Sequence, residues 1–334
     1  MSAVTRWLSV LAAAGSLALF TPAEAAARTK LRIATVAPKN SAWGKVFKVW
    51  AKAVDQKSDG KLRLDVYYNA VQGMDDAMVG KMRTGQLDGA ALTSVGLSRI
   101  YKDVLVLQIP GVVDTWPLLD KVRGELKGDL EKSFEKEGFK ITSWGDIGLI
   151  RQMTKGFALR RPSDMKGKHP LVWREEPMGP VIYSVIGGVT PVPLGPPEVL
   201  PALRSGKINV ISAPALAAEQ LQWTPYLDHI SSRVSVCAIG GTVFRKKSLD
   251  DLPADARAVF LDVQSKMNKM AANRIRKLDD EAYARISKKM TIVDMPRSEE
   301  AEWEKVLRES VTRLRQGTLD RALIDRVLKL TGKG

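Results

Sequence analysis

The side chains that most often perform catalysis or bind metal ions are scarce in this sequence. Among its 334 residues there are one cysteine, Cys237, and two histidines, His169 and His229. One cysteine cannot form an internal disulfide, an iron–sulfur cluster or a cysteine-based zinc site, and two histidines leave little for a metal site or a histidine-driven triad. The Gly-x-Ser-x-Gly, P-loop, Gly-x-Gly-x-x-Gly and His-Glu-x-x-His motifs do not occur. The sequence therefore argues against most enzyme classes, and against a cofactor or metal site.

Two groups of neighbouring carboxylates could supply an acid and a base. Glu175 and Glu176 lie in an expected loop, and Asp279, Asp280 and Glu281 lie in an expected helix. Acid–base catalysis needs two carboxyl groups that converge in a cleft, whereas adjacent helix residues point apart. We therefore expect both groups to be solvated surface charges, as runs of charge usually are.

The elements that must position any site alternate between apolar strands and amphipathic helices, the order typical of an α/β sheet. In the first part of the chain we predict strands at 31–36, 62–68 and 87–93, and helices at 41–57, 74–83 and 117–136. The pattern restarts with a strand at 170–173, a helix at 197–204 and a strand at 208–211. A helical pattern of about 40 residues follows at 252–295, and helices at 298–316 and 320–330 close the chain.

A short internal sequence repeat supports two similar lobes. Lys81–Asp88 resembles Ala202–Asn209, 121 residues further on, and each copy leaves a helix at a glycine and enters a strand. No linker rich in Pro, Gly or Ser separates the lobes, so crossing strands should join them. We expect lobe I at 28–148 plus about 238–280, lobe II at 149–237 plus about 281–332, and a long helix across both.

The carboxyl ends of the predicted strands point to a binding cleft. Open α/β sheets bind their ligands at this edge. Pro38 comes after the first strand, Thr93 and Ser94 are at the end of the third, and Ala213 comes after a strand of the second lobe. We expect these residues to line the cleft.

The first 27 residues are typical of an export signal. Arg6 gives the positive start, Trp7–Phe20 is an apolar stretch, and Ala23-Glu24-Ala25 is a small-x-small cleavage pattern. An apolar run of this length is too short to span about 30 Å of hydrocarbon, and no later segment has the 18 or so apolar residues of a membrane helix. We expect a soluble, periplasmic mature protein that does not itself span the membrane.

The chain is strongly basic, with a formal net charge of +15 and a pI near 9.8. Such a charge favours acidic partners of any kind. The basic residues, however, alternate with acidic ones along helices, and there is no arginine-rich block or nucleic-acid-binding motif. We therefore expect a solvated basic surface and no nucleic-acid partner.

Several segments, in this order, carry a family resemblance. They are Ala37-Pro38, Ser41-Ala42-Trp43, the segment Met82–Gly89, the segment Arg161–Gly167, Pro191-Val192-Pro193-Leu194 and the segment Glu198–Gly206. The chain resembles the periplasmic solute-binding proteins of TRAP transporters, of the DctP type. That resemblance implies two α/β lobes that close on a ligand, usually an organic acid, and delivery of the ligand to permease subunits driven by an ion gradient, without an ATPase.

The resemblance also implies site residues, and one of them is changed. Many members place an arginine four residues after the Lys-Gly of the second lobe, where a guanidinium can bind a carboxylate in a bidentate manner. Leu171 stands there in this chain, followed by Trp173 and Arg174. Arg151 falls on the auxiliary arginine of the family, 16 residues before the glycine, and Asp75 on a polar cleft position. Arg174 and Trp173 offer a polar and an aromatic contact.

These observations predict an extracytoplasmic solute receptor rather than an enzyme. Because leucine stands in place of the family's main carboxylate-binding arginine, the expected ligand is a monocarboxylate with a hydrophobic or aromatic body, or a lipid-like molecule. Arg151 and Arg174 would hold it. Two alternatives stay open: a receptor that presents its ligand to a sensor protein, and a basic exported protein that binds membranes or polyanions.

Overall fold

The computed structural model describes residues 29–333, so the predicted signal segment lies outside the described residues. The elements are β1 (Thr29–Thr35), α1 (Ala42–Lys57), β2 (Leu62–Tyr67), α2 (Asp75–Arg83), β3 (Gly89–Thr93), α3 (Ser94–Ile100), η1 (Lys102–Gln108), α4 (Trp116–Lys136), β4 (Phe139–Thr154), η2 (Pro162–Met165), β5 (Leu171–Trp173), α5 (Met178–Ile186), β6 (Val192–Leu194), α6 (Pro196–Arg204), β7 (Val210–Pro214), α7 (Ala215–Gln220), η3 (Thr224–Tyr226), β8 (His229–Ser231), β9 (Val236–Arg245), α8 (Lys246–Asp250), α9 (Ala254–Ile286), β10 (Thr291–Val293), α10 (Arg297–Leu314) and α11 (Arg321–Thr331).

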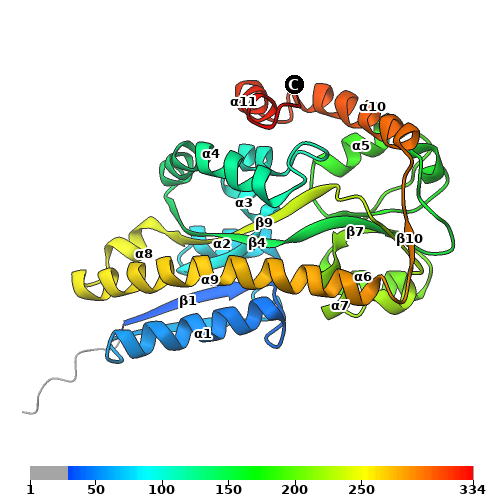
Figure 1. Cartoon of the computed structure of the whole chain (residues 1–334). Coiled ribbons are helices and arrows are strands. Elements are labelled where there is room, and N and C mark those ends of the chain that lie inside the picture. Colours follow the sequence, from blue (N-terminus) through cyan, green and yellow to red (C-terminus); the bar gives the residue numbers. More distant parts are fainter. Residues whose placement is uncertain (1–28, 334) are drawn as a thin grey trace, which may run out of the picture.

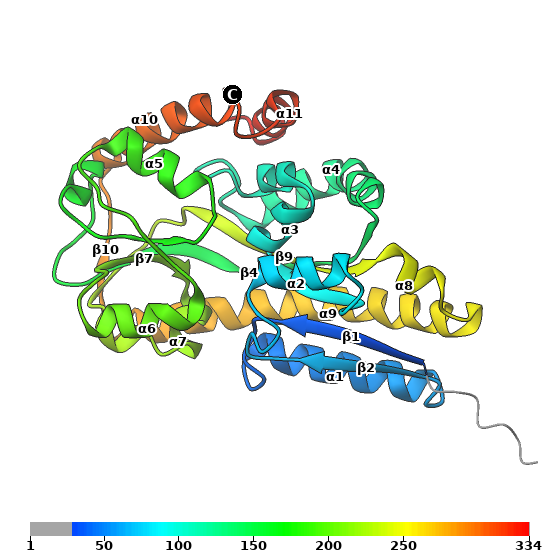
Figure 2. The same cartoon turned by 180° about the vertical axis from the view of Figure 1, so that it is seen from behind.

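One mixed sheet runs through the molecule in the order β10-β8-β4-β9-β3-β1-β2, and β7 pairs with β4 off this path. β1 pairs in parallel with β2 and β3, whereas β9 is antiparallel to both β3 and β4. The 16-residue strand β4 pairs with β9 and, at its far end, with β7 and β8. It therefore passes from a first lobe around β1–β3 to a second lobe around β5–β8 (Figures 1 and 2).

The first helix shows why the local predictions succeed. The Ser41 hydroxyl caps α1 by accepting a hydrogen bond from the Gly44 N–H at 3.1 Å, as expected of an N-cap serine. Trp50 and Val54 from the apolar stripe of this helix are buried. Trp50 packs against Phe244 of β9 and Phe260 of α9. The helix is thus fixed by its cap and by one apolar face.

The long helix is confirmed, but it is shorter than predicted. α9 has 33 residues and packs against α1 in the first lobe and α7 in the second, so it spans both lobes (Figure 1). It ends at Ile286 rather than at 295, because Thr291–Val293 pairs with β8 as the edge strand β10.

The two C-terminal helices divide between the lobes. α10 packs on α5 of the second lobe, and α11 packs on α4 and η1 of the first (Figure 2). Ile324 and Val327 of α11 lie in the same core cluster as Leu126 of α4. The predicted assignment of residues 281–332 to lobe II therefore does not fit α11, since the apolar face of that helix is buried against the first lobe. The other lobe boundaries stay a prediction.

Candidate ligand-binding cleft

A cavity of about 600 Å³ lies between the two lobes. The first lobe contributes the end of β1, the start of α2 and the β3–α3 junction, and the second lobe contributes β5, α5, β7 and α7. The crossing strands β4 and β9 and the middle of α9 form the base. The volume lies in the range of pockets that enclose small organic molecules.

The structure brings eight of the nine predicted site residues to this cavity. They are Pro38, Asp75, Thr93, Ser94, Leu171, Trp173, Arg174 and Ala213. They come from both lobes and lie mostly where strands end, as the rule for open α/β sheets predicts. Their contact with a ligand stays a prediction.

Arg151 is the exception, because it is not among the described residues that line the cavity. Side chains alternate along a strand, and Ile150 and Gln152 line the cavity while Arg151 does not. The Arg151 guanidinium instead lies 4.0 Å from the ring centre of Tyr283 on α9. Its Nε is buried and has no hydrogen-bond partner among residues 29–333. Arg151 therefore packs behind the strand, against the long helix.

The cavity walls are largely aromatic and aliphatic. The indoles that line it are Trp43, Trp50, Trp144, Trp173, Trp223 and Trp303. Trp173 and Trp223 lie side by side in the second lobe, with ring centres 6.1 Å apart. Leu171 is only 4% exposed and belongs to the core of that lobe as well as to the wall. Such walls suit a hydrophobic or aromatic ligand body.

Asp75 fixes the end of β3 where it meets the cavity. Its carboxylate accepts hydrogen bonds from the Thr93 N–H at 3.0 Å and from the Thr93 hydroxyl at 2.9 Å. Burial raises the pKa of Asp75 to about 6, and the two hydrogen bonds oppose that rise. A side chain at Gly96 would place its Cβ 2.6 Å from Asp75 Oδ1, so glycine leaves room for this contact.

The charged groups at the second-lobe wall are mostly paired. Arg174 donates to Glu198 at 2.7 Å, and both side chains are about half exposed. Arg99 of the first lobe forms an ion pair with Glu175 of the second. The Glu176 carboxylate accepts hydrogen bonds from the Met178 and Gly179 N–H groups, and burial raises its pKa. Glu176 is therefore not the solvated charge that the sequence suggested.

Asp279 also departs from the expected surface position. It is 2% exposed and accepts hydrogen bonds from the Leu149 N–H at 2.7 Å and the Leu216 N–H at 2.9 Å. Its carboxylate therefore joins α9 to β4 and to the start of α7. Burial raises its pKa, while the nearby Arg151 charge lowers it. The carboxylate run on α9 includes a structural residue because one face of this helix is buried.

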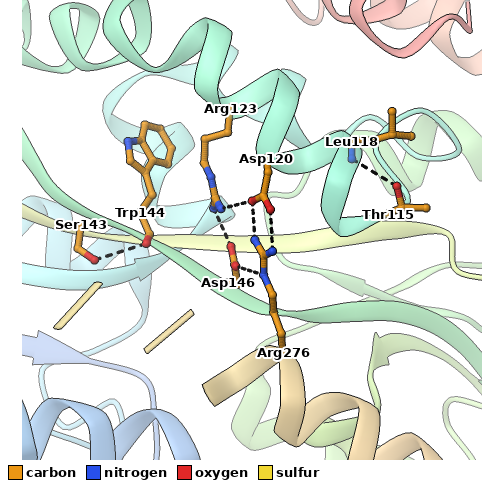
Figure 3. Close-up of polar contacts among 8 residues, drawn as sticks. All are labelled: Thr115, Leu118, Asp120, Arg123, Ser143, Trp144, Asp146 and Arg276. Carbon is orange, nitrogen blue, oxygen red and sulfur yellow. Dashed lines mark hydrogen bonds and ion pairs between the residues drawn. The ribbon is translucent and has the colours of Figure 1, made fainter. Parts of the chain in front are cut away.

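Asp146 of β4 lines the base of the cavity, and two arginines neutralise its charge. Figure 3 shows these ion pairs. The Asp146 side chain has no exposed surface and accepts from Arg123 and Arg276, both at 2.6 Å. Asp120 of α4 binds the same two arginines, at 3.1 and 2.6 Å. The network joins α4, β4 and α9, and offers no free charge to a ligand.

Arg233 lines the cavity and was not among the predicted site residues. It lies in the connection between β8 and β9 and is half-buried. Within residues 29–333 its guanidinium has no ion-pair or hydrogen-bond partner, and only its backbone N–H is bonded, to Ser231 Oγ at 3.1 Å. No motif marks this position, so only the folding of the strands reveals it.

A family model decides the classification. The chain matches the model of the bacterial extracellular solute-binding protein family 7, DctP, over residues 33–316. The chain belongs to this family. It is 25% identical over 274 residues to a solute-binding protein of Verminephrobacter eiseniae, with 81% of each chain covered.

Solved structures show the same fold. A TRAP periplasmic solute-binding protein from Shewanella oneidensis with bound succinate has a TM-score of 0.84 at 18% identity, over 91% of this chain and all of the other. DctP7, a Bordetella pertussis extracytoplasmic solute receptor binding pyroglutamic acid, has a TM-score of 0.83 at 15% identity, with 91% of this chain and 100% of that one covered. The predicted two-lobed α/β fold and the predicted family are confirmed.

This DctP-family protein thus belongs to a family of bacterial extracellular solute-binding proteins, which is not an enzyme family. In the part of the chain that the structure describes, no helix is both long and apolar enough to cross a membrane. The same residues contain no group of three or more Cys, His, Asp or Glu side chains placed to hold a metal ion.

Proposed function

We propose that this protein is the receptor of a TRAP-type secondary transporter, that it binds an organic carboxylate with a hydrophobic body, and that it delivers this ligand to membrane permease subunits. The observation that carries the proposal is the inter-lobe cavity, whose walls come from both lobes and are largely apolar. The relatives with succinate and pyroglutamic acid support a small carboxylic acid as the ligand.

Ligand binding would act by stabilising the closed arrangement of the lobes. Two polar contacts already cross between the lobes: the Ala42 N–H donates to Gln220 Oε1 at 2.9 Å, and Arg99 pairs with Glu175. A ligand that touches both walls adds contacts that only the closed state makes, so it shifts the population toward closure. The permease would then recognise the closed form.

The proposal places the receptor in the periplasm, with the signal segment removed by cleavage after Ala25 or Ala27. The apolar stretch and the small-x-small pattern of that segment support export. Lobe II, around the second half of β4 and β5–β8, would move against lobe I through the crossing strands.

The binding function is tested on protein purified without denaturant. Native mass spectrometry would reveal a co-purified acid, and thermal unfolding would be measured with phenylacetate, phenylpyruvate, 4-methyl-2-oxopentanoate, octanoate and succinate. A ligand at 100 times its Kd stabilises the folded state by about 2.7 kcal/mol, which raises the Tm of a chain of this size by about 4 °C. No co-purified acid and no shift with any of the five would contradict the proposal.

A further inference from the structure

We infer that Arg233 is the anchor for the ligand's carboxylate and that the cleft accepts a single negative charge. The inference rests on the proposed function and names its ligand class and its anchoring residue. Arg233 would take over carboxylate binding from two positions of the family. Leu171 stands at the first, and Arg151, at the second, lies behind β4.

The argument starts from the cations that reach the cavity. Among the described residues, the arginines and lysines that line it are Arg174 and Arg233. Arg174 is committed to Glu198 at 2.7 Å and is more than half exposed, so a ligand would have to compete with that carboxylate and with water. Arg233 is half-buried, and its guanidinium is unpaired within residues 29–333. A guanidinium in that state is matched by a carboxylate, which it can bind in a bidentate manner.

The acidic residues of the lining limit the ligand to one charge. Asp75, Asp76 and Glu176 line the cavity, and no ion pair compensates them in the part of the chain described here. The charge of Asp146 is compensated by its ion pairs with Arg123 and Arg276. A dicarboxylate would therefore bring its second charge into a wall where the described residues supply carboxylates and no second unpaired cation. Like charges repel strongly where water is excluded.

The remaining unpartnered polar atoms of the walls are neutral. Among the residues that line the cavity, four buried neutral atoms have no hydrogen-bond partner in residues 29–333: Trp43 Nε1, Trp50 Nε1, Gln108 Oε1 and Gln264 Oε1. Each of these atoms is itself covered by neighbouring groups and carries no charge, so none of them adds a second anchor for a carboxylate. The structure thus favours a monocarboxylate with an apolar body and at most neutral polar substituents.

The test separates the contribution of the ligand's negative charge to affinity from the contribution of its apolar body. The tightest-binding acid among phenylacetate, phenylpyruvate, 4-methyl-2-oxopentanoate and octanoate is titrated calorimetrically, together with its primary amide, which keeps the body and removes the charge. In the wild type we expect the acid to bind at least tenfold more tightly than both the amide and succinate. Arg233→Gln should weaken acid binding at least tenfold, leave amide binding within twofold, and so remove the discrimination.

Three further variants make the test decisive. Arg274→Gln is the matched control, because Arg274 is exposed on α9 and does not line the cavity. This variant should bind the acid as the wild type does. Arg174→Gln should change acid binding by less than threefold. Arg233→Lys keeps the charge without the bidentate fork and should weaken acid binding by about threefold to tenfold; it also serves if the glutamine variant does not fold.

The outcomes separate the inference from the function. If the wild type binds an acid and neither Arg233 variant weakens it, or if Arg174→Gln alone does so, the assignment of the anchor is wrong while the receptor function stands. If succinate binds as tightly as the best monocarboxylate, the single-charge inference is wrong. If no acid binds the wild type, both the proposed function and the assignment of Arg233 as the anchor are wrong.

Discussion

Asp146→Ala should destabilise the protein more than any substitution of an exposed acid. Figure 3 shows the Asp146 side chain between Arg123 and Arg276, and both arginines bind it. Asp146 has no exposed side-chain surface, and the two arginine side chains are 13% and 19% exposed. Removing one member of a buried ion pair costs about 3–5 kcal/mol, because the partner's charge is left buried and uncompensated. Asp120 still binds both arginines and is half exposed, so we expect the lower end, about 3 kcal/mol.

The assay is thermal unfolding followed by circular dichroism. Unfolding entropy scales with chain length, so about 3 kcal/mol corresponds to a fall in Tm of about 5 °C for a chain of this size. Asp262→Ala is the control: Asp262 pairs with Lys266 on the same long helix, but both side chains are mostly exposed, and its Tm should change by less than about 1 °C.

A double-mutant cycle checks the cause of that loss. Asp146→Ala combined with Arg123→Ala should cost less than the sum of the two single changes, because the second change removes a charge that the first left unpaired. Equal Tm values for the Asp146 and Asp262 variants, or strict additivity in the cycle, would refute the reasoning.

Three other predictions follow from single residues. The pKa of Asp75 is about 6 in the folded protein against an ordinary value of 3.8, so the folded state binds this proton more tightly and the free energy of unfolding falls as the pH rises from about 4 to about 6. Over that range the Asp75→Asn variant should lose less stability than the wild type, with a difference of up to about 3 kcal/mol. Urea unfolding measured against pH checks this, and identical pH profiles for the two proteins would contradict it. Burial raises the pKa of Cys237 to about 12, so Ellman's reagent should label it at pH 8 only after unfolding; prompt labelling of the native protein would show the thiol to be accessible. Gly44→Ala would bring a Cβ to 2.2 Å from the Pro38 carbonyl oxygen, so it should lower the Tm and weaken acid binding, whereas Gly80→Ala, with open space around it, should do neither.

Much of the fold follows from local chemistry. The cap at Ser41 and the apolar stripe through Trp50 and Val54 define α1 to within a residue. Pro38, just beyond β1, and Thr93, at the end of β3, line the cavity. The rule that open α/β sheets bind ligands at the carboxyl ends of their strands, rather than any motif, predicts this position.

The orientation of Arg151 could not be predicted from spacing. β4 has irregular pairing with β9 between Asp146 and Gly148, where one extra residue is accommodated. Because side chains alternate along a strand, one inserted residue changes which of the following residues face the cavity. The spacing from Gly167 therefore places Arg151 in the correct strand, β4, but does not show that its side chain lies on the face away from the cavity.

Arg233 and Asp279 escaped prediction for a different reason. Arg233 enters the cavity from the connection between β8 and β9, and its place depends on the pairing of strands that are distant in sequence. Asp279 is buried because α9 packs against both β4 and α7, and the sequence of a single helix does not tell which side will be covered.

The most direct test of the account is a crystal structure of the protein with the tightest-binding monocarboxylate of the panel. The account predicts that the acid lies between the lobes, with its carboxylate within hydrogen-bond distance of the Arg233 guanidinium and its apolar body along the indoles of Trp43 and Trp173. An acid bound outside the inter-lobe cavity, or one whose carboxylate contacts other residues and leaves Arg233 free, would contradict it.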